Sequence, residues 1–471
     1  MTTGRRAVMA VAGVLALTGC TSFADTLAAA DRSSAPVAGG SAPATISCPA
    51  DRAQPDPHRP RIAFDFRLED DRSTVTGTET VTFTPDLPIE ELVFRLVPNG
   101  PGSAGGNRLE VNRVRGDDVA RGRYEKAGAD PPGGLYVIDL DGELAAGEST
   151  RLELDFTLTL GSGAFDRFGT DKRLSWWASG APLLAWEPGV GWAKDPFVRL
   201  NGETTTSPAA DTTIEVSAPA DLTVLMTGAQ EQPTAARDGR RTWTSHEPAA
   251  RDVSVAAGAF TTEERTTPDG VRVTAGVLPG ADLTAGGLAD SAVSAIGKLE
   301  KLLGPFPYRT LTVPLLPDYG GGIEYPSSIL EATSSAFVLV HEVAHMWFYG
   351  MVGNDQFRDP WLDEAFATYA EAVVNPADAA DLRPALDLDG EVGAAMDAFT
   401  TFRSYQSVVY GKGAAALLTA RDAAGAPAFD AAIRCYVDAN AWTIATPADL
   451  GAVLDRLPDA VAVLERAHAL D

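Results

Sequence analysis

The stretch that decides the fold runs from Val338 to Glu371 and reads VLVHEVAHMWFYGMVGNDQFRDPWLDEAFATYAE. His341 and His345 are four residues apart, so on a helix both imidazoles face one side and can bind a single ion. Glu342 lies about 100° round the helix from His341, where it can hold a catalytic water beside the metal. The carboxylate of Glu364, 19 residues after His345, would supply a third ligand. Two histidines and one glutamate leave the fourth tetrahedral position open, as is typical of catalytic zinc.

The residues around this motif favour two helices. The chain has only 5 His among 471 residues, so the motif is rarely expected by chance. Apolar residues recur at helical spacing through the motif, after Ser334 and Ser335 as candidate N-caps. Asp359 followed by Pro360 is typical of a helix start, which places Glu364 one turn inside a second helix. The alternative interpretation is a solvated helix with two surface histidines.

The segments HEVAHMWFYGMVG and DPWLDEAFATYAE resemble the aminopeptidase N family, zinc aminopeptidases within the gluzincins. That family pairs His-Glu-x-x-His with a glutamate ligand at this separation. The resemblance implies a metallopeptidase with one Zn²⁺ ion held by His341, His345 and Glu364. It also implies that Glu342 is the catalytic acid and base.

A glycine-rich segment upstream carries the resemblance further. Residues 320–326, GGGIEYP, resemble the family's Gly-x-Met-Glu-Asn segment, with isoleucine and tyrosine in place of methionine and asparagine. Gly321 and Gly322 allow another backbone to approach, and a strand after them can pair with an extended peptide. The resemblance gives Glu324 the role of binding the free α-amine of the substrate. From its residues alone, the segment is interpreted as a flexible turn with an exposed glutamate.

A segment downstream, VVYGKG at residues 408–413, resembles the family's Tyr-x-Lys-Gly segment. The resemblance implies that the Tyr410 hydroxyl stabilises the oxyanion of the tetrahedral intermediate, which requires a donor aimed at the developing charge. Without the resemblance, Tyr410 is interpreted as a packing residue. Lys412 is interpreted as structural.

Composition limits the classes of function. With 471 residues and 45% hydrophobic content, the chain is long enough for two or three globular domains. Its net charge of −26 argues against nucleic-acid binding, which requires a basic face. The acidic balance would mildly favour cationic partners such as peptide α-amines.

Residues 1–20 predict a lipoprotein signal peptide. Arg5 and Arg6 precede an apolar run from Ala7 to Leu17, and the closing Leu-Thr-Gly-Cys resembles the bacterial lipobox, in which Cys20 receives the lipid. An ordinary cleaved signal with a chance cysteine is the alternative. The prediction is an exported bacterial lipoprotein on the extracytoplasmic face of the cell membrane, with the choice between Sec and twin-arginine export left open.

The rest of the chain divides by pattern. Residues 21–60, rich in Ala, Ser, Pro and Gly, predict a disordered tether. Residues 61–261 show period-two alternation between turn residues, which predicts an antiparallel, sandwich-like β domain. Residues 262–471 predict strand, helix and strand before the two zinc helices and further helices after them. This order resembles a thermolysin-like α+β catalytic domain, in a short form without the large C-terminal helical domain of long family members.

Two features leave alternatives open. The tryptophan-rich stretch from Leu174 to Trp192 can be a carbohydrate or peptide platform, but packing at the domain junction is the favoured interpretation. Cys48 and Cys435 can form one disulfide in an oxidising compartment, or remain two thiols.

The resulting hypothesis is a membrane-tethered zinc aminopeptidase that cleaves the N-terminal bond of peptides with a free N-terminus. A zinc endopeptidase or an epoxide hydrolase on the same scaffold would share the metal but not the amine anchor. A non-catalytic surface lipoprotein would use the β domain for binding. The preferred N-terminal residue and the oligomeric state do not follow from the sequence.

Overall fold

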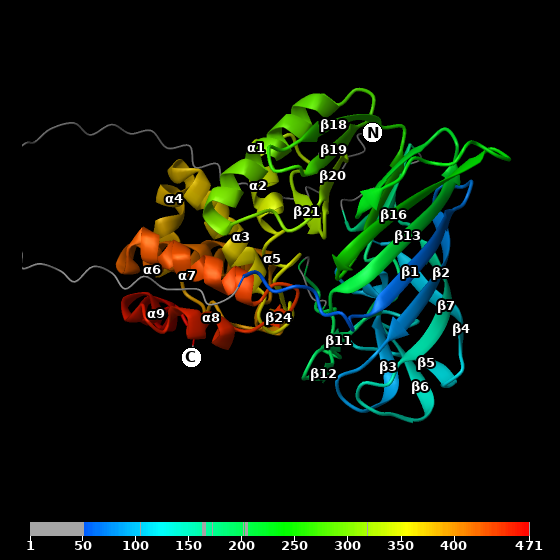
Figure 1. Ribbon diagram of the computed structural model, residues 1–471, viewed down its shortest axis with the longest axis horizontal. Helices are drawn as coiled ribbons and strands as arrows, with labels where there is room; N and C mark the ends of the chain where they lie inside the picture. Colours follow the sequence, from blue (N-terminus) through cyan, green and yellow to red (C-terminus); the bar gives the residue numbers. More distant parts are fainter. Residues whose placement is uncertain are drawn as a thin grey trace, which may run out of the picture.

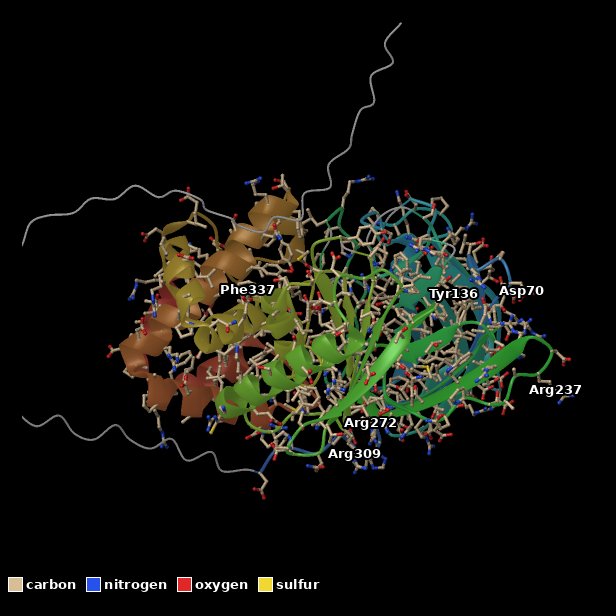
Figure 2. The ribbon with its side chains drawn as sticks, turned by 90° about the horizontal axis from the view of Figure 1, so that it is seen from above. Asp70, Tyr136, Arg237, Arg272, Arg309 and Phe337 are labelled. Atoms are coloured by element: carbon tan, nitrogen blue, oxygen red, sulfur yellow. The ribbon has the colours of Figure 1, made fainter. Side chains whose placement is uncertain are left out.

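The computed structural model describes residues 51–470, except residues 104, 163–165, 172, 201, 203–205 and 318 (Figure 1). The predicted signal peptide, Cys20, Cys48 and the first thirty residues of the predicted tether therefore lie outside the described residues. A β half and a helical half lie side by side. In Figure 2, Asp70, Tyr136 and Arg237 mark the first half and Phe337 marks the second. Within the described part of the chain, no helix is long and apolar enough to span a membrane.

The β half is organised around a seven-stranded sheet. Its strands form because apolar and polar residues alternate: β1, RIAFDFRL, buries every second side chain. In order across the sheet, the strands are β15 (Ala229–Gln230), β16 (Arg240–Ala250), β13 (Ala210–Pro219), β1 (Arg61–Leu68), β2 (Thr74–Phe83), β7 (Thr150–Thr159) and β4 (Arg108–Gly116). The fold class predicted from sequence is confirmed, with one difference in pairing. β1 and β13 run parallel, and Arg61 lies opposite Asp211.

Smaller sheets pack against this one. One consists of β10 (Leu183–Leu184), β3 (Ile89–Arg95), β6 (Leu135–Leu144) and β5 (Val119–Glu125); another consists of β14 (Thr223–Met226), β17 (Ser254–Gly258), β9 (Leu174–Ala178) and β8 (Phe168–Thr170). β11 (Trp186–Glu187) and β12 (Gly191–Trp192) form a short pair. Phe66, Phe94 and Trp177, from three different sheets, belong to one buried core. Layered sheets that share a core are what the sandwich-like prediction requires.

The tryptophan stretch packs at the junction, as the favoured interpretation predicted. Trp176 and Trp177, neighbours on β9, are each only 1% exposed. They point to opposite faces of the strand. Trp177 enters the β-domain core, whereas Trp176 joins a second core with Tyr325 and Leu330 of the other half. The two halves thus meet through a shared apolar cluster.

The helical half contains a five-stranded sheet in the order β18 (Thr261–Thr266), β19 (Arg272–Val277), β20 (Thr310–Leu315), β22 (Ser328–Glu331) and β21 (Gly322–Tyr325). The helix α1 (Ala285–Leu303) is the one predicted between two strands, and its apolar side packs against this sheet. It begins where Thr284 accepts a hydrogen bond from the Gly287 amide. β21 is the edge strand, and among the described residues no further strand pairs with it.

Helices surround the site-bearing segments. They are α2 (Ala336–Ala344), α3 (Trp361–Val374), α4 (Pro376–Leu382), α5 (Phe402–Tyr405), α6 (Gly413–Ala424), α7 (Ala426–Ala439), α8 (Pro447–Leu454) and α9 (Pro458–Arg466), with a π-helical segment η4 (Gln406–Lys412) between α5 and α6. Short 3₁₀ turns are η1 (Val97–Asn99) in the β half and η2 (Arg383–Asp387) and η3 (Met396–Ala398) in the helical half. The strands β23 (Gly353–Asn354) and β24 (Ile444–Ala445) form a short pair.

One predicted N-cap position is confirmed and the other is wrong. Ser335 occupies the N-cap position of α2, but its side chain makes no capping hydrogen bond. Pro360, rather than Asp359, occupies the N-cap position of α3. Both helices lie largely inside the apolar core, so tertiary packing rather than side-chain capping stabilises them.

Candidate metal centre and active site

Two helices bring the predicted metal ligands together. His341 lies in the last turn of α2, His345 follows directly at its C-terminal end, and Glu364 lies in the first turn of α3. The two histidine Nε2 atoms are 3.1 Å apart, and each lies 3.3 Å from Glu364 Oε2. Three ligand atoms from residues 23 positions apart in sequence therefore form a nearly equilateral triangle.

This triangle has the dimensions of a zinc site. Tetrahedral zinc with nitrogen and oxygen ligands at about 2.0–2.1 Å requires ligand atoms about 3.3 Å apart. The measured separations of 3.1 and 3.3 Å agree with that spacing. His345 and Glu364 are buried, and His341 keeps 14% of its side chain exposed, so the site is dry but reachable. The residues present fit one zinc ion.

The charges around the imidazoles also fit a cation. Burial alone lowers the pKa of His345, but the carboxylates of Glu324 and Glu364 outweigh it and raise the pKa to about 9. The pKa of His341 is likewise raised despite burial, through Glu364 and Glu371. Burial would raise the pKa of Glu364, yet the two imidazoles lower it. Without a metal the two imidazoles bind protons more tightly than usual, and a divalent ion would displace these protons.

Glu342 lies against the glycine-rich segment. An added Cβ on Gly322 would approach Glu342 Cγ to 2.6 Å and Cδ to 2.8 Å, so only glycine leaves room for this carboxylate. Gly321 differs, because an added Cβ there would meet nothing within 4 Å. At Gly322 the close neighbour is thus the side chain of Glu342, whereas the sequence predicted the approach of another backbone, which stays a prediction for the bound peptide.

Glu324 projects from the edge strand β21 toward the same centre. Three groups lie close together here: the carboxylates of Glu324 and Glu342 and the imidazole of His345. One ligand atom from each lies within 4.8 Å of the other two. The side chain is 4% exposed, so the exposed turn expected from the local sequence alone is not what forms. The hairpin partner β22 pairs Glu324 with Ile329.

Tyr410 reaches the centre from the π-helical segment η4. Its hydroxyl donates a short hydrogen bond to Glu364 Oε1, and its ring stacks on His341 with the centroids 5.9 Å apart. Burial and the Glu364 carboxylate raise the pKa of Tyr410 well above its usual value, so the hydroxyl retains its proton. π-Helical turns are frequent at functional sites, where they reorient a side chain. Lys412, at the end of η4, donates to the Gly390 carbonyl 2.6 Å away, in keeping with a structural role.

Two further carboxylates, those of Glu371 and Glu331, lie at the site, and the sequence analysis did not predict them. Glu371 Oε2 lies 3.5 Å from His341 Nδ1, where it orients the ring from behind. Its position seven residues after Glu364, two turns along one helix face, is a signal that could have identified it. Glu331, at the end of β22, has a pKa well above its usual range because of burial and the charge of Glu342. No local pattern marks Glu331.

The other histidines lie away from this centre. His246 Nε2 lies 2.6 Å from Asp211 Oδ1 on the β half. Within the described residues, neither His246, His58 nor His468 joins a group of side chains able to hold a metal.

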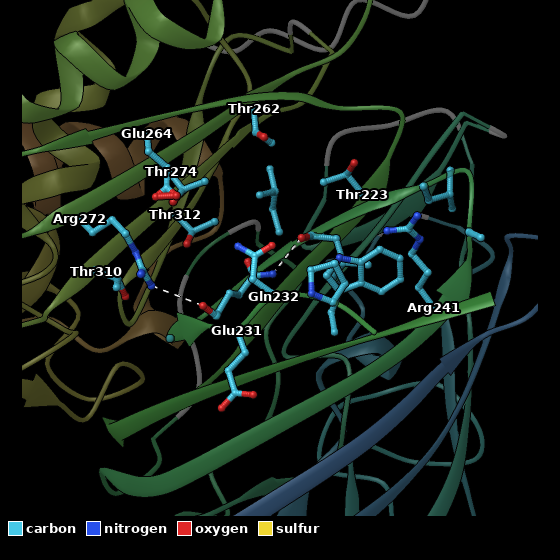
Figure 3. A pocket seen from close by; sticks show the side chains of 18 of the residues that line it. Thr223, Glu231, Gln232, Arg241, Thr262, Glu264, Arg272, Thr274, Thr310 and Thr312 are labelled. Atoms are coloured by element: carbon cyan, nitrogen blue, oxygen red, sulfur yellow. Dashed lines mark hydrogen bonds between the residues drawn. The ribbon is translucent and has the colours of Figure 1, made fainter. Parts of the chain in front are cut away.

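A separate polar cleft of about 410 Å³ lies between the two halves (Figure 3). Its walls come from β14 to β16 and from β18 to β20, and they carry the side chains of Thr223, Arg241, Thr262, Glu264, Arg272, Thr274, Thr310 and Thr312. None of the residues of the metal centre lines it.

Similarity to known proteins agrees with this geometry. The peptidase family M1 domain matches residues 324–383. Aminopeptidase M1-B of Oryza sativa subsp. japonica is 23% identical over 242 residues, which are 43% of this chain and 27% of that protein. Aminopeptidase N of Streptomyces lividans is 50% identical over 42 residues, which are 9% of this chain and 5% of that protein. The match therefore spans about a quarter or less of these relatives' length.

The fold has a counterpart over nearly its whole length. The M1 zinc metallopeptidase from Deinococcus radiodurans superposes with a TM-score of 0.66 at 20% identity, covering 89% of this chain and 96% of that chain. The M1 domain match and the aminopeptidase relatives support the resemblance of this chain to the aminopeptidase N family, and the Deinococcus radiodurans zinc metallopeptidase shares its fold.

Proposed function

We propose that this chain is a zinc aminopeptidase that removes the N-terminal residue from peptides. His341, His345 and Glu364 would hold one zinc ion. When bound, zinc supplies Lewis-acid chemistry, which polarises a carbonyl and lowers the pKa of a water molecule.

Glu342 is the proposed acid and base. It takes the proton of the attacking water and passes it to the departing amine, which needs a carboxylate within hydrogen-bond reach of both. Its side chain packs directly against Gly322, which places the carboxylate at the centre of the cluster. Positioning of this kind lowers the barrier because the reacting groups are already arranged.

The observation that carries the exopeptidase assignment is the closeness of Glu324 to Glu342. Their carboxylates, with the His345 imidazole, lie within 4.8 Å of one another. The α-amine of a residue lies about 2.5 Å from that residue's own carbonyl carbon. An ammonium group paired with Glu324 therefore leaves room for one residue before the scissile bond at Glu342. A peptide entering along the edge strand β21 would end there.

The proposed role of Tyr410 is to donate a hydrogen bond to the oxyanion that develops on the scissile carbonyl. Its hydroxyl is buried, remains protonated and already points into the centre at Glu364. A preorganised donor in a dry site needs no reorganisation during the reaction, and removing one such donor typically costs roughly 3–4 kcal/mol of transition-state stabilisation.

Substrates observed in a similar protein are consistent with this proposal. A variant of the Deinococcus radiodurans metallopeptidase has been crystallised with a Tyr-Ser-Ala substrate. By analogy, we propose short peptides with a free N-terminus as substrates of this chain.

The test compares each peptide with its N-acetylated form. An aminopeptidase cleaves the free peptide and leaves the acetylated one intact, because acetylation removes the charge that pairs with Glu324. Equal cleavage of both forms would instead indicate an endopeptidase. Glu342→Gln is the matched variant: it should retain zinc, measured by metal analysis, while turnover disappears.

We also propose that the chain is an exported lipoprotein anchored through Cys20. The support is the sequence alone, with paired arginines, an apolar run and a Leu-Thr-Gly-Cys end. Fatty-acid labelling of the wild type and Cys20→Ala, followed by membrane fractionation, tests it. A wild-type protein that takes up no label would refute the anchor.

A further inference from the structure

The hairpin that carries Glu324 turns at a strained, fully buried serine. β21 and β22 pair antiparallel with Tyr325 opposite Ser328, so Pro326 and Ser327 form a two-residue turn. Ser327 has φ of +52° and is 0% exposed. The turn position after proline favours glycine when φ is positive, because a Cβ there is strained. A non-glycine residue persists in such a conformation when surrounding contacts hold it.

Contacts from the β half hold Ser327. The Gly228 amide donates to Ser327 Oγ at 2.9 Å. The Ser327 hydroxyl also faces the carboxylate of Glu247, which lies on β16 and is 6% exposed. Since the Gly228 amide supplies a proton to Oγ, the hydroxyl proton is available to the Glu247 carboxylate. The serine is thus fixed from both sides by one domain while it belongs to the other.

The neighbouring hairpin residues are held in the same way. Tyr325 Oη accepts a hydrogen bond from Arg167 Nη1 at 2.9 Å. Ser254 Oγ donates to Ser328 Oγ at 2.7 Å. Both partners come from the β half, so three residues of the hairpin hydrogen-bond across the domain junction.

These contacts determine where Glu324 lies. Successive residues of a strand point to opposite faces, so Tyr325 reaches the β half while Glu324 reaches the metal centre. A rotation or slip of the hairpin would move Glu324 by the same amount. Because Glu324 binds the substrate amine, its misplacement weakens substrate binding and raises KM more than it lowers kcat.

We propose that Glu247 and Ser327 are positioning residues, which clamp the β21–β22 hairpin to the β domain and thereby hold Glu324 where it binds the substrate amine. The clamp makes substrate affinity depend on the N-terminal domain, although no residue of that pair touches the substrate. This inference rests on the proposed role of Glu324 in the aminopeptidase reaction.

The clamp also has a pH signature. Burial raises the pKa of Glu247 to about 7, against the opposing hydrogen bonds from Ser327 and the Ala249 amide and the opposing charges of His246 and Arg309. Tyr308 is the other titratable group facing Glu247, and burial keeps it protonated through this range. Above about pH 7 the ionised Glu247 is a stronger acceptor for the Ser327 hydroxyl than a neutral acid or amide.

The experiment uses the zinc-loaded full chain with Ser327→Ala, Ser327→Gly and Glu247→Gln. Loss of the hydroxyl should raise KM for free-amine substrates about tenfold and leave kcat within about threefold, because a buried hydrogen bond to a charged group is lost. Ser327→Gly, which relieves the positive φ, should show the same KM as Ser327→Ala. The KM ratio of Glu247→Gln to wild type should be near one at pH 6 and should rise at pH 8.

Thr150→Val is the matched control. Thr150 is buried in the same domain and donates to Asp118 Oδ2 at 3.0 Å, away from the hairpin. Its KM should equal that of the wild type even if it loses comparable stability. If the contacts of Ser327 and Glu247 only stabilised the fold, the Ser327, Glu247 and Thr150 variants would all have the KM of the wild type. That result would overturn the inference.

Amide hydrogen exchange separates this inference from the proposed function. Exchange in residues 322–331 should accelerate at pH 8 in Ser327→Ala and Glu247→Gln, but not in Thr150→Val. Unchanged exchange, or unchanged KM in an active wild-type background, refutes the clamp. A wild type that leaves free-amine peptides uncut refutes the aminopeptidase proposal, while exchange still decides whether the clamp exists. If Ser327→Ala does not fold, Glu247→Gln carries the test.

Discussion

Gly322→Ala is the sharpest probe of the catalytic centre. The added Cβ would lie 2.6 Å from Glu342 Cγ, 2.8 Å from Cδ and 2.9 Å from Oε1. Carbon atoms prefer separations of about 3.5–4.0 Å, so the carboxylate must recede by roughly 1 Å. A displacement of that size costs about a hundredfold in kcat, or about 2.7 kcal/mol of transition-state stabilisation. The fold should survive, because a flexible side chain rather than backbone gives way.

The assay measures kcat, KM, zinc content and Tm for Gly322→Ala beside Gly321→Ala. At Gly321 an added Cβ meets nothing within 4 Å, so this neighbour introduces the same methyl group without displacing Glu342. We expect a large fall in kcat only for Gly322→Ala, with zinc bound and Tm within a few degrees of wild type in both. Equal activity in the two variants would refute the argument that Gly322 makes room for the catalytic carboxylate.

Three further predictions concern the surrounding groups. Tyr410→Phe should lower kcat about a hundredfold with little change in KM, as for the loss of one oxyanion donor; an unchanged kcat would remove Tyr410 from the mechanism. Glu371→Gln should weaken zinc binding about tenfold in a chelator competition, because the ring of His341 loses its charged acceptor; equal affinity would count against that role. Glu247 has a raised pKa, so the folded chain holds a proton that the unfolded chain releases near pH 4.5, and stability falls as pH rises toward about 7. Urea unfolding should show Glu247→Gln losing less stability than wild type between pH 5 and pH 8, by up to about 3 kcal/mol; parallel pH profiles would contradict the shift.

Much of the fold and the centre of the site followed from local patterns. Period-two alternation predicted the strands of the β half, and β1 buries every second residue as that pattern requires. The spacing of His341 and His345 places both imidazoles on one face of any helix, whatever surrounds it. The resemblance to a known family then named Glu324 and Tyr410, and the structure brings both to the centre that contains Glu364. Their catalytic roles remain predictions.

What the sequence alone determined is therefore the set of elements and the residues with metal-binding chemistry, since both depend on neighbours a few positions apart. Only the tertiary structure decided that β1 runs parallel to β13, that Glu342 lies against Gly322, and that the Gly228 amide bonds Ser327 across the domain junction. These contacts join segments from separate parts of the chain. Their geometry depends on how sheets and helices pack, and packing is a property of the whole core rather than of any local pattern.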